Sequence, residues 1–206
     1  MKLSRMAIAA IGAVFFSACG GGAGTSAVAP PASAPFDSAQ GDMAGSIAPD
    51  EVSAAAYCRK TGGEIETRRP VYGSNGSKLL FLAGKRVFCQ YTKKSDGSRI
   101  HILLSTLYTT KPTLAALAYI LKPPMGSCNG NPASCYCSFL GGSDQFGGTN
   151  GAGGGWYKKN GVDQTLEACI FPDESSIDSW GLAYHSHGII RGINLDKVMR
   201  YKYPGG

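Results

Sequence analysis

A repeated cysteine motif constrains the fold of this chain more than any other feature of its 206 residues. The pattern Tyr-Cys-x-x-x-Gly-Gly occurs at residues 57–63 and again at residues 136–142. The cysteine within each copy is followed by another at nearly the same distance, 31 positions later at Cys89 and 32 positions later at Cys169. Self-similarity at a fixed spacing indicates a duplicated structural unit.

The duplication predicts an α+β protein made of two similar small modules, residues 51–125 and 126–206. Each module is expected to contain a short helix that a disulfide joins to an antiparallel β-meander. In the first copy, the acidic residues Asp50 and Glu51 favour a helix start ahead of residues 52–61. The glycine pair is expected to end this helix in both copies, because glycine adopts the positive φ that a helix end requires.

Hydrophobic periodicity and turn residues locate the other expected elements. We expect strands over residues 79–82, 86–92, 99–104 and 165–171, and helices over residues 114–121, 176–185 and between Pro132 and Gly141. The glycine-rich stretch 147–155 is expected to be a loop. It does not join a strand to a helix and lacks the lysine of a phosphate-binding loop.

The first 18 residues have the three parts of a signal peptide. Lys2 and Arg5 form a basic start, residues 6–16 form an apolar run, and the small residues Ser17 and Ala18 follow. The apolar run has 11 residues, whereas a helix needs about 20 to cross a bilayer. We therefore expect this segment to direct export and then to be removed.

The residues at positions 16–19, Phe-Ser-Ala-Cys, resemble the lipobox of bacterial lipoproteins. This resemblance implies cleavage before Cys19 and a diacylglycerol on its sulfur, and two or more acyl chains hold a protein on a membrane stably. Gly20 stands where lipoproteins of the inner membrane often carry Asp, which favours an outer-membrane anchor facing the periplasm or the cell surface. Residues 19–50 are rich in Gly, Ala, Ser and Pro, so we expect a flexible tether.

The number of cysteines fits an oxidising compartment. The chain has seven, so setting aside the lipidated Cys19 leaves six, an even number that favours disulfides. Six cysteines allow 15 connectivities, and pairing within each repeat is the choice that gives both copies the same bond. The predicted disulfides are Cys58–Cys89, Cys137–Cys169 and Cys128–Cys135.

The second copy also carries Asn-Pro-Ala at residues 131–133 and Phe-Pro-Asp at residues 171–173, with Trp180 beyond them. Here the sequence resembles a family of small bacterial lipoprotein domains of unknown function that often carry a hemolysin label. The resemblance covers about residues 131–183, and residues 52–107 only weakly. In departures from the family pattern, Ile177 replaces the usual third cysteine, Glu174 replaces the glycine of the turn, and the fourth cysteine is missing.

Charge is distributed unevenly along the folded part of the chain. Residues 51–125 hold 12 Lys and Arg against 4 acidic residues, which gives +8, whereas residues 126–206 hold 6 against 7, which gives −1. A positive half can attract an anionic envelope polymer or an acidic protein. No basic motif interleaved with aromatic residues is present, so we expect no nucleic-acid partner.

Candidate catalytic or metal-binding residues are few. His185 and His187, with Asp178 nearby, could bind a metal or exchange protons, but residues two apart share no helix face, and no third ligand can be named. Cys135 and Cys137 lack the two-residue gap of redox and zinc motifs. We therefore expect no metal, no cofactor and no catalytic residue, and an enzyme that uses His185 or His187 is the least favoured alternative.

Aromatic and basic residues are the remaining candidates for recognition. Trp156 and Tyr157, with Arg68 and Arg69, are expected to form a recognition surface. The predicted function is that of a non-enzymatic envelope lipoprotein, with a binding or structural role toward another envelope component. A hemolysin-like or toxin-like effector and an inhibitor of a periplasmic hydrolase are the alternatives.

Overall fold

The structure is a computed structural model that describes residues 49–73, 78–144, 154–160 and 163–205. The predicted signal peptide, Cys19 and almost all of the predicted tether lie outside the described residues, as does most of the predicted loop 147–155. Within the described ranges, no helix has both the length and the apolar character needed to span a bilayer.

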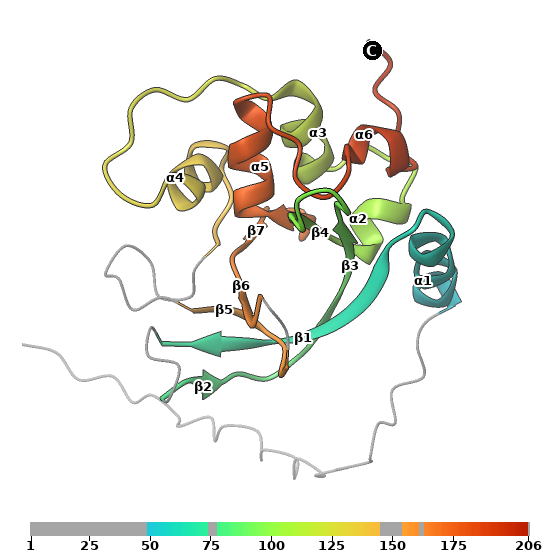
Figure 1. The fold of residues 1–206 in the computed structure, drawn as a ribbon, viewed down its shortest axis with the longest axis horizontal. Helices are drawn as coiled ribbons and strands as arrows, with labels where there is room; N and C mark the ends of the chain where they lie inside the picture. Colours follow the sequence, from blue (N-terminus) through green and yellow to red (C-terminus); the bar gives the residue numbers. More distant parts are fainter. Residues whose placement is uncertain (1–48, 74–77, 145–153, 161–162, 206) are drawn as a thin grey trace, which may run out of the picture. The chain divides into compact units, whose positions relative to one another are not determined.

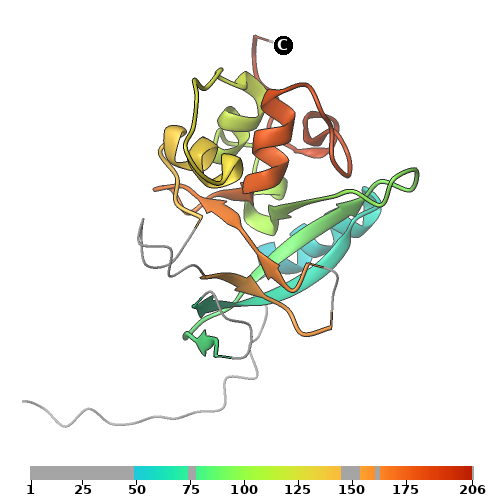
Figure 2. The ribbon, with the colours of Figure 1, turned by 60° about the vertical axis from the view of Figure 1, so that its left-hand side comes forward.

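The described strands form one antiparallel sheet, which Figures 1 and 2 show from two sides. The strands are β1 (Glu64–Tyr72), β2 (Leu80–Phe81), β3 (Arg86–Thr92), β4 (Arg99–Leu103), β5 (Gly154–Tyr157), β6 (Thr165–Leu166), β7 (Ala168–Ile170) and β8 (Ser176–Asp178). Their order across the sheet is β6-β5-β1-β3-β4-β8-β7, with β2 paired to β1 off this path. Because β5 and β6 extend the sheet beyond β1, strands from the two halves of the sequence are interleaved.

The centre of the sheet joins the two halves through the pairing of Ile102 in β4 with Ile177 in β8. Ile102 is also paired with Cys89 of β3, and Ile177 with Cys169 of β7. The second cysteine of each repeat therefore lies at an equivalent register position on either side of the centre.

The helices pack against one face of this sheet and form the main core with it. They are α1 (Pro49–Lys60), α2 (Leu104–Tyr108), α3 (Leu114–Leu121), α4 (Pro132–Phe139), α5 (Ser179–Ser186) and α6 (Leu195–Val198). Side chains cap four of their N-termini, as expected for Thr, Asn and Asp: Thr113, Asn131, Asp178 and Asn194. Figure 1 shows α3 to α6 gathered at the end of the molecule that carries the C-terminus, whereas β2 and β5 lie at the other end.

Three disulfides join the predicted cysteine pairs. The Cα–Cα distances are 5.8 Å for Cys58–Cys89, 5.6 Å for Cys137–Cys169 and 6.2 Å for Cys128–Cys135. The four cysteines of the two longer loops are fully buried in the main core. Each of these two disulfides joins a helix to a strand, as predicted.

The glycine pairs end their helices in the same way in both copies. Gly62 has φ +87° and Gly141 has φ +83°, a conformation that L-residues with a side chain rarely adopt. The amide of Gly63 donates to the carbonyl of Cys58 over 2.9 Å, and the amide of Gly142 donates to the carbonyl of Cys137 over the same distance.

The sequence predicted the α+β class, the antiparallel strands and most of the elements. Other details were wrong. The strands of residues 51–125 and 126–206 share one sheet and do not form two separate modules. Helices α2 and α6 were not predicted, and Gly154 and Gly155 of the predicted loop belong to β5. Residues 64–72 form β1, which was not predicted. The predicted helix 176–185 begins as strand β8 and becomes helical at Ser179. The predicted strand 165–171 is broken at Glu167, whose carboxylate accepts hydrogen bonds from the Asn131 amide.

Candidate functional site

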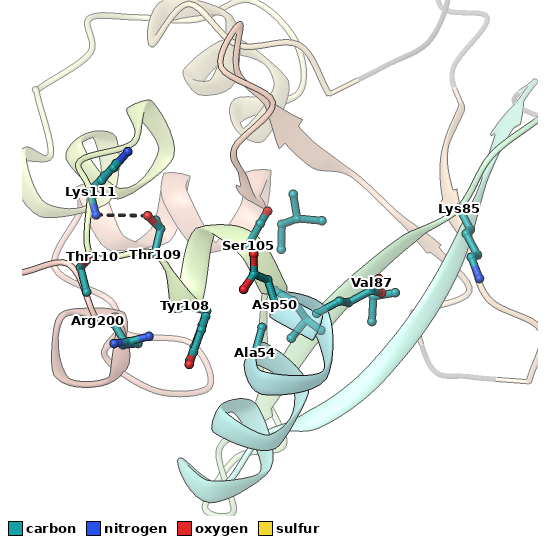
Figure 3. Close-up of a pocket in the computed structure, with 13 residues that line it drawn as sticks. Asp50, Ala54, Lys85, Val87, Ser105, Tyr108, Thr109, Thr110, Lys111 and Arg200 are labelled. Atoms are coloured by element: carbon teal, nitrogen blue, oxygen red, sulfur yellow. Dashed lines mark hydrogen bonds between the residues drawn. The ribbon is translucent and has the colours of Figure 1, made fainter. Parts of the chain in front are cut away.

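A groove beside α2 combines an apolar floor with charged walls (Figure 3). Its first part has a volume of about 630 Å³. Buried Ala54, Leu103 and Leu104 form the floor, with half-buried Val87 and Tyr108 beside them. The charged residues that line it are Asp50, Glu51, Lys85, Lys111 and Arg200. A second hollow, described below, shares part of this lining, and we call the two hollows together the α2 groove.

One wall of the groove is formed by the C-terminal segment and by the loop after α2, and each of these makes one contact that holds the wall in place. The guanidinium carbon of Arg200 lies 4.2 Å from the ring centroid of Tyr108, a cation–π contact that keeps a positive charge beside the apolar floor. The amide of Lys111 donates to the hydroxyl of Thr109 over 3.1 Å. Figure 3 shows Lys111 and Arg200 on one side of the hollow and Lys85 on the other.

The second part of the α2 groove also has a volume of about 630 Å³. The residues that line both parts are Lys85, Leu103, Ser105, Thr109 and Lys111. Asp173 lines the second part, but its carboxylate accepts hydrogen bonds from the amide of Leu114 and from Ser175. Partial burial alone would raise the pKa of Asp173, whereas these hydrogen bonds lower it. This carboxylate is therefore held by the protein itself, whereas Asp50, Glu51 and Glu174 line the groove together with its cations.

A buried ionic cluster lies on the face of the sheet opposite the main core. Arg68 of β1 donates to the carboxylate of Glu66 over 2.6 Å and to the backbone carbonyl of Trp156 over 3.0 Å. The second oxygen of Glu66 accepts from Lys158 over 2.6 Å. His101 of β4 lies between two carboxylates, 3.3 Å from Glu66 and 3.4 Å from Asp178.

The contacts within this cluster shift the pKa values of Glu66 and His101 in opposite directions. Burial alone would raise the pKa of Glu66, but hydrogen bonds with His101, Lys158 and the neighbouring guanidinium hold that pKa well below its usual range. Burial alone would lower the pKa of His101, whereas its contacts with Asp178 and Glu66 raise it. Glu66, Arg68, His101 and Asp178 are each less than 5% exposed. A substrate in solvent cannot reach them, so we assign the cluster a structural role in tying β1, β4 and β8 together.

The structure separates the histidine pair that the sequence suggested as a metal or proton-transfer site. His185 is buried in α5 and stacks on Tyr119 with 3.8 Å between ring centroids. Burial and the charge of Lys122 lower the pKa of His185 to about 4. His187 is exposed at the end of the same helix, with Nδ1 2.9 Å from the carbonyl of Ala183. Over the part of the chain that the structure describes, no group of three or more His, Cys, Asp or Glu residues could hold a metal.

The recognition surface predicted from sequence is wrong for two of its four residues. Trp156 is 7% exposed and packs with Phe88 in a small core on the face opposite the main core. Arg68 is 1% exposed because it belongs to the ionic cluster. Tyr157 is half-buried and Arg69 is exposed, and the two are directly paired across β1 and β5.

The third disulfide lies in a hollow at the N-terminus of α4. Cys128 and Cys135 are half-buried and line this hollow, which has a volume of about 850 Å³. Asp144 is buried in the same wall. Burial raises the pKa of the nearby Glu167, and the charge of Asp144 raises it further. The hollow therefore carries fewer cations than the α2 groove and is the poorer candidate for an anionic ligand.

No protein-family model, no curated protein and no solved structure matches the chain.

Proposed function

We propose that this protein is a lipid-anchored binding module of the bacterial envelope with no catalytic activity of its own. One observation carries the proposal: all six cysteines after position 19 are paired in three disulfides. Disulfides persist in oxidising compartments outside the cytoplasm. The pairing leaves Cys19 as the one cysteine available for a lipid, at the position where the sequence resembles a lipobox.

The α2 groove is the proposed binding site. Its apolar floor provides contact area for the non-polar part of a ligand, and a few charged groups on a concave wall provide orientation. In its first part, the three cations Lys85, Lys111 and Arg200 outnumber the two carboxylates Asp50 and Glu51, which favours an anionic group. The proposed ligand is therefore an acidic envelope protein or an anionic envelope polymer.

The proposed architecture is a tandem repeat of one stapled unit, related to the lipoprotein domains that carry a hemolysin label. Support comes from the two equivalent helix ends, the two disulfides of nearly equal loop length, and the register of the central strands. In the first copy, β3, β4 and α2 follow one another. In the second copy, β7, β8 and α5 follow in the same order. The Ile102–Ile177 pair would then mark the line along which the two copies were joined.

The anchoring part of the proposal is tested by a Cys19→Ser variant in cells grown with radiolabelled palmitate. The wild-type protein should carry the label and sediment with membranes, whereas the variant should carry none. Label that persists on the variant would contradict the proposal.

The binding site is tested by a photo-crosslinking amino acid placed in the α2 groove of the full-length protein. Ser105 is exposed and lines both parts of the groove, so it is the position of choice. Lys197 is exposed on α6 and lines neither part, so it is the matched control. A crosslinked product at Ser105 that is absent at Lys197 supports the groove as the site, and equal products at both positions would contradict it.

A further inference from the structure

We infer that the strand β2 and its flanking residues form a second membrane contact, which docks the domain on an anionic bilayer surface. The inference rests on the proposed function in one respect, because the lipid on Cys19 would bring the domain to that surface.

Apolar side chains of β2 are exposed where the sheet offers them no cover. Leu80 is 60% exposed and Phe81 is 53% exposed, although both are large apolar residues. The ring of Tyr157 packs edge-on against the Phe81 ring, with 5.3 Å between centroids. Contiguous exposed apolar side chains, as opposed to single ones, mark contact sites for proteins or membranes. We call Leu80, Phe81 and Tyr157 the β2 tip.

The β2 tip lies at the end of the molecule away from most of the helices. β2 pairs with β1 through Val71↔Phe81 and Tyr72↔Leu80, and among the described strands it has no other partner. Figures 1 and 2 both show β2 and the far end of β1 on the side opposite α3, α5 and α6. A flat surface can therefore approach the β2 tip without meeting these helices.

The charge around the β2 tip is positive. Between residues 67 and 95 the sequence contains no Asp or Glu, and the cations nearest β2 along the chain are Lys78, Lys85 and Arg86. Lys78 and Lys85 flank the strand and are exposed, and Arg69, paired with Tyr157, is exposed as well. Basic residues around apolar and aromatic ones match the headgroup region of an anionic bilayer, where aromatic rings and the stems of Lys and Arg side chains settle.

A membrane explains this combination better than a protein partner does. A protein surface would need a shaped complement to a strand of two residues, whereas a bilayer accepts any protruding apolar side chain among cations. Contact through the β2 tip would turn α3, α5 and α6 away from the membrane. The acyl chains would then anchor the protein, and the β2 tip would set its orientation.

The test measures the depth of the β2 tip in vesicles that carry the full-length acylated protein. A Phe81→Trp variant is reconstituted into vesicles of phosphatidylcholine with or without phosphatidylglycerol, and the acyl chains carry bromine as a quencher. Leu121→Trp is the matched control, because Leu121 is 54% exposed but lies on α3. Emission of the wild-type protein is subtracted to remove the contribution of Trp156 and Trp180.

We expect the tryptophan at position 81 to be quenched severalfold more than the one at position 121 in anionic vesicles. The difference should shrink in phosphatidylcholine alone. Lys78→Glu with Lys85→Glu should abolish it, whereas Lys60→Glu with Lys94→Glu, at exposed positions elsewhere, should not. Equal quenching at positions 81 and 121 in anionic vesicles, with both variants retaining three disulfides, would overturn the inference.

Flotation of the same vesicles separates this inference from the proposed anchoring. Protein that floats with phosphatidylcholine vesicles but shows no selective quenching at position 81 keeps its anchor and lacks the second contact. Protein that fails to float with phosphatidylcholine overturns the anchoring. In that case the wild-type protein should still bind anionic vesicles through the β2 tip, and the double variant Lys78→Glu with Lys85→Glu should not bind them. If the wild-type protein does not bind anionic vesicles either, the second contact is overturned as well.

Discussion

The close packing of Gly63 and Gly142 against the two long-loop disulfides leads to a quantitative prediction. A Cβ atom at Gly63 would lie 2.3 Å from the sulfur of Cys89 and 2.9 Å from that of Cys58. A Cβ atom at Gly142 would lie 2.4 Å from the sulfur of Cys169 and 3.0 Å from that of Cys137. Both sulfurs of each pair are bonded and buried, so neither can rotate away from the added methyl group.

Gly63→Ala and Gly142→Ala should therefore each destabilise the protein, and by similar amounts. Overpacking of a rigid core costs about 1–3 kcal/mol. For a domain of this size, 1 kcal/mol lowers Tm by about 2–4 °C, so each variant should melt about 2–12 °C lower. The control is Gly126→Ala, because a Cβ atom there would meet no atom within 4 Å.

The assay is thermal and urea unfolding of the full-length protein in detergent under non-reducing conditions. Gly126→Ala should unfold within about 0.5 kcal/mol of the wild-type protein. A wild-type midpoint for either Gly63→Ala or Gly142→Ala would refute the reasoning. A large loss in one and none in the other would refute the equivalence of the two helix ends.

Three further predictions concern the ionic cluster, the buried histidine and the short disulfide. Arg68→Met should lower the free energy of unfolding by about 3–5 kcal/mol, because it leaves the buried Glu66 without its guanidinium; a loss below 1 kcal/mol in urea unfolding would contradict this. As the pH falls from 6.5 to 4, the free energy of unfolding of the wild-type protein should decrease by up to about 3 kcal/mol because of His185. The pKa of His185 is lowered in the folded state, so the unfolded state binds the proton at a higher pH. His185→Phe should remove that part of the pH dependence, and an unchanged pH profile of urea midpoints would count against it. Replacing Cys128 and Cys135 by Ala should lower the free energy of unfolding by about 2 kcal/mol, whereas removing either long-loop disulfide should lower it by about 4 kcal/mol in the chain-entropy model. A larger loss for the Cys128–Cys135 disulfide in urea unfolding would contradict this ranking.

Local signals in the sequence predicted several helices and strands, and the disulfides that join them, well. The helix at residues 114–121 and the strand at residues 86–92 have the predicted bounds, because the hydrophobic pattern and the flanking turns agree there. The two long-loop disulfides followed from the nearly equal spacing of their cysteines, and Cys128–Cys135 was the pair that remained. Spacing along a chain is preserved in a duplication even when the sequence between the cysteines changes.

The sequence could not reveal β1, because its inward positions are charged. Glu66 and Arg68 alternate with more exposed residues, as a strand requires. In a sequence, however, a carboxylate and a guanidinium predict exposed positions, and only the fold shows that His101 lies beside them. For the same reason Arg68 was assigned to a recognition surface. His101 itself gave a weak signal, a single polar residue in the otherwise apolar run Ile-His-Ile-Leu at residues 100–103.

The position of the functional surfaces also depends on contacts that are remote in sequence. Asp50 of α1 and Arg200 near the C-terminus both line the α2 groove. The β2 tip brings Phe81 against Tyr157. Neither pair shares a motif or a periodicity, so only the folded chain shows that these residues belong together.

We propose that the mature protein is an acylated envelope lipoprotein whose other six cysteines are all oxidised. Mass spectrometry of the protein extracted from membranes under non-reducing conditions tests it most directly. We expect an N-terminal peptide that begins at Cys19 and carries acyl chains, together with peptides linked as Cys58–Cys89, Cys128–Cys135 and Cys137–Cys169. An unmodified Cys19, or a free thiol at any of the other six positions, would contradict it.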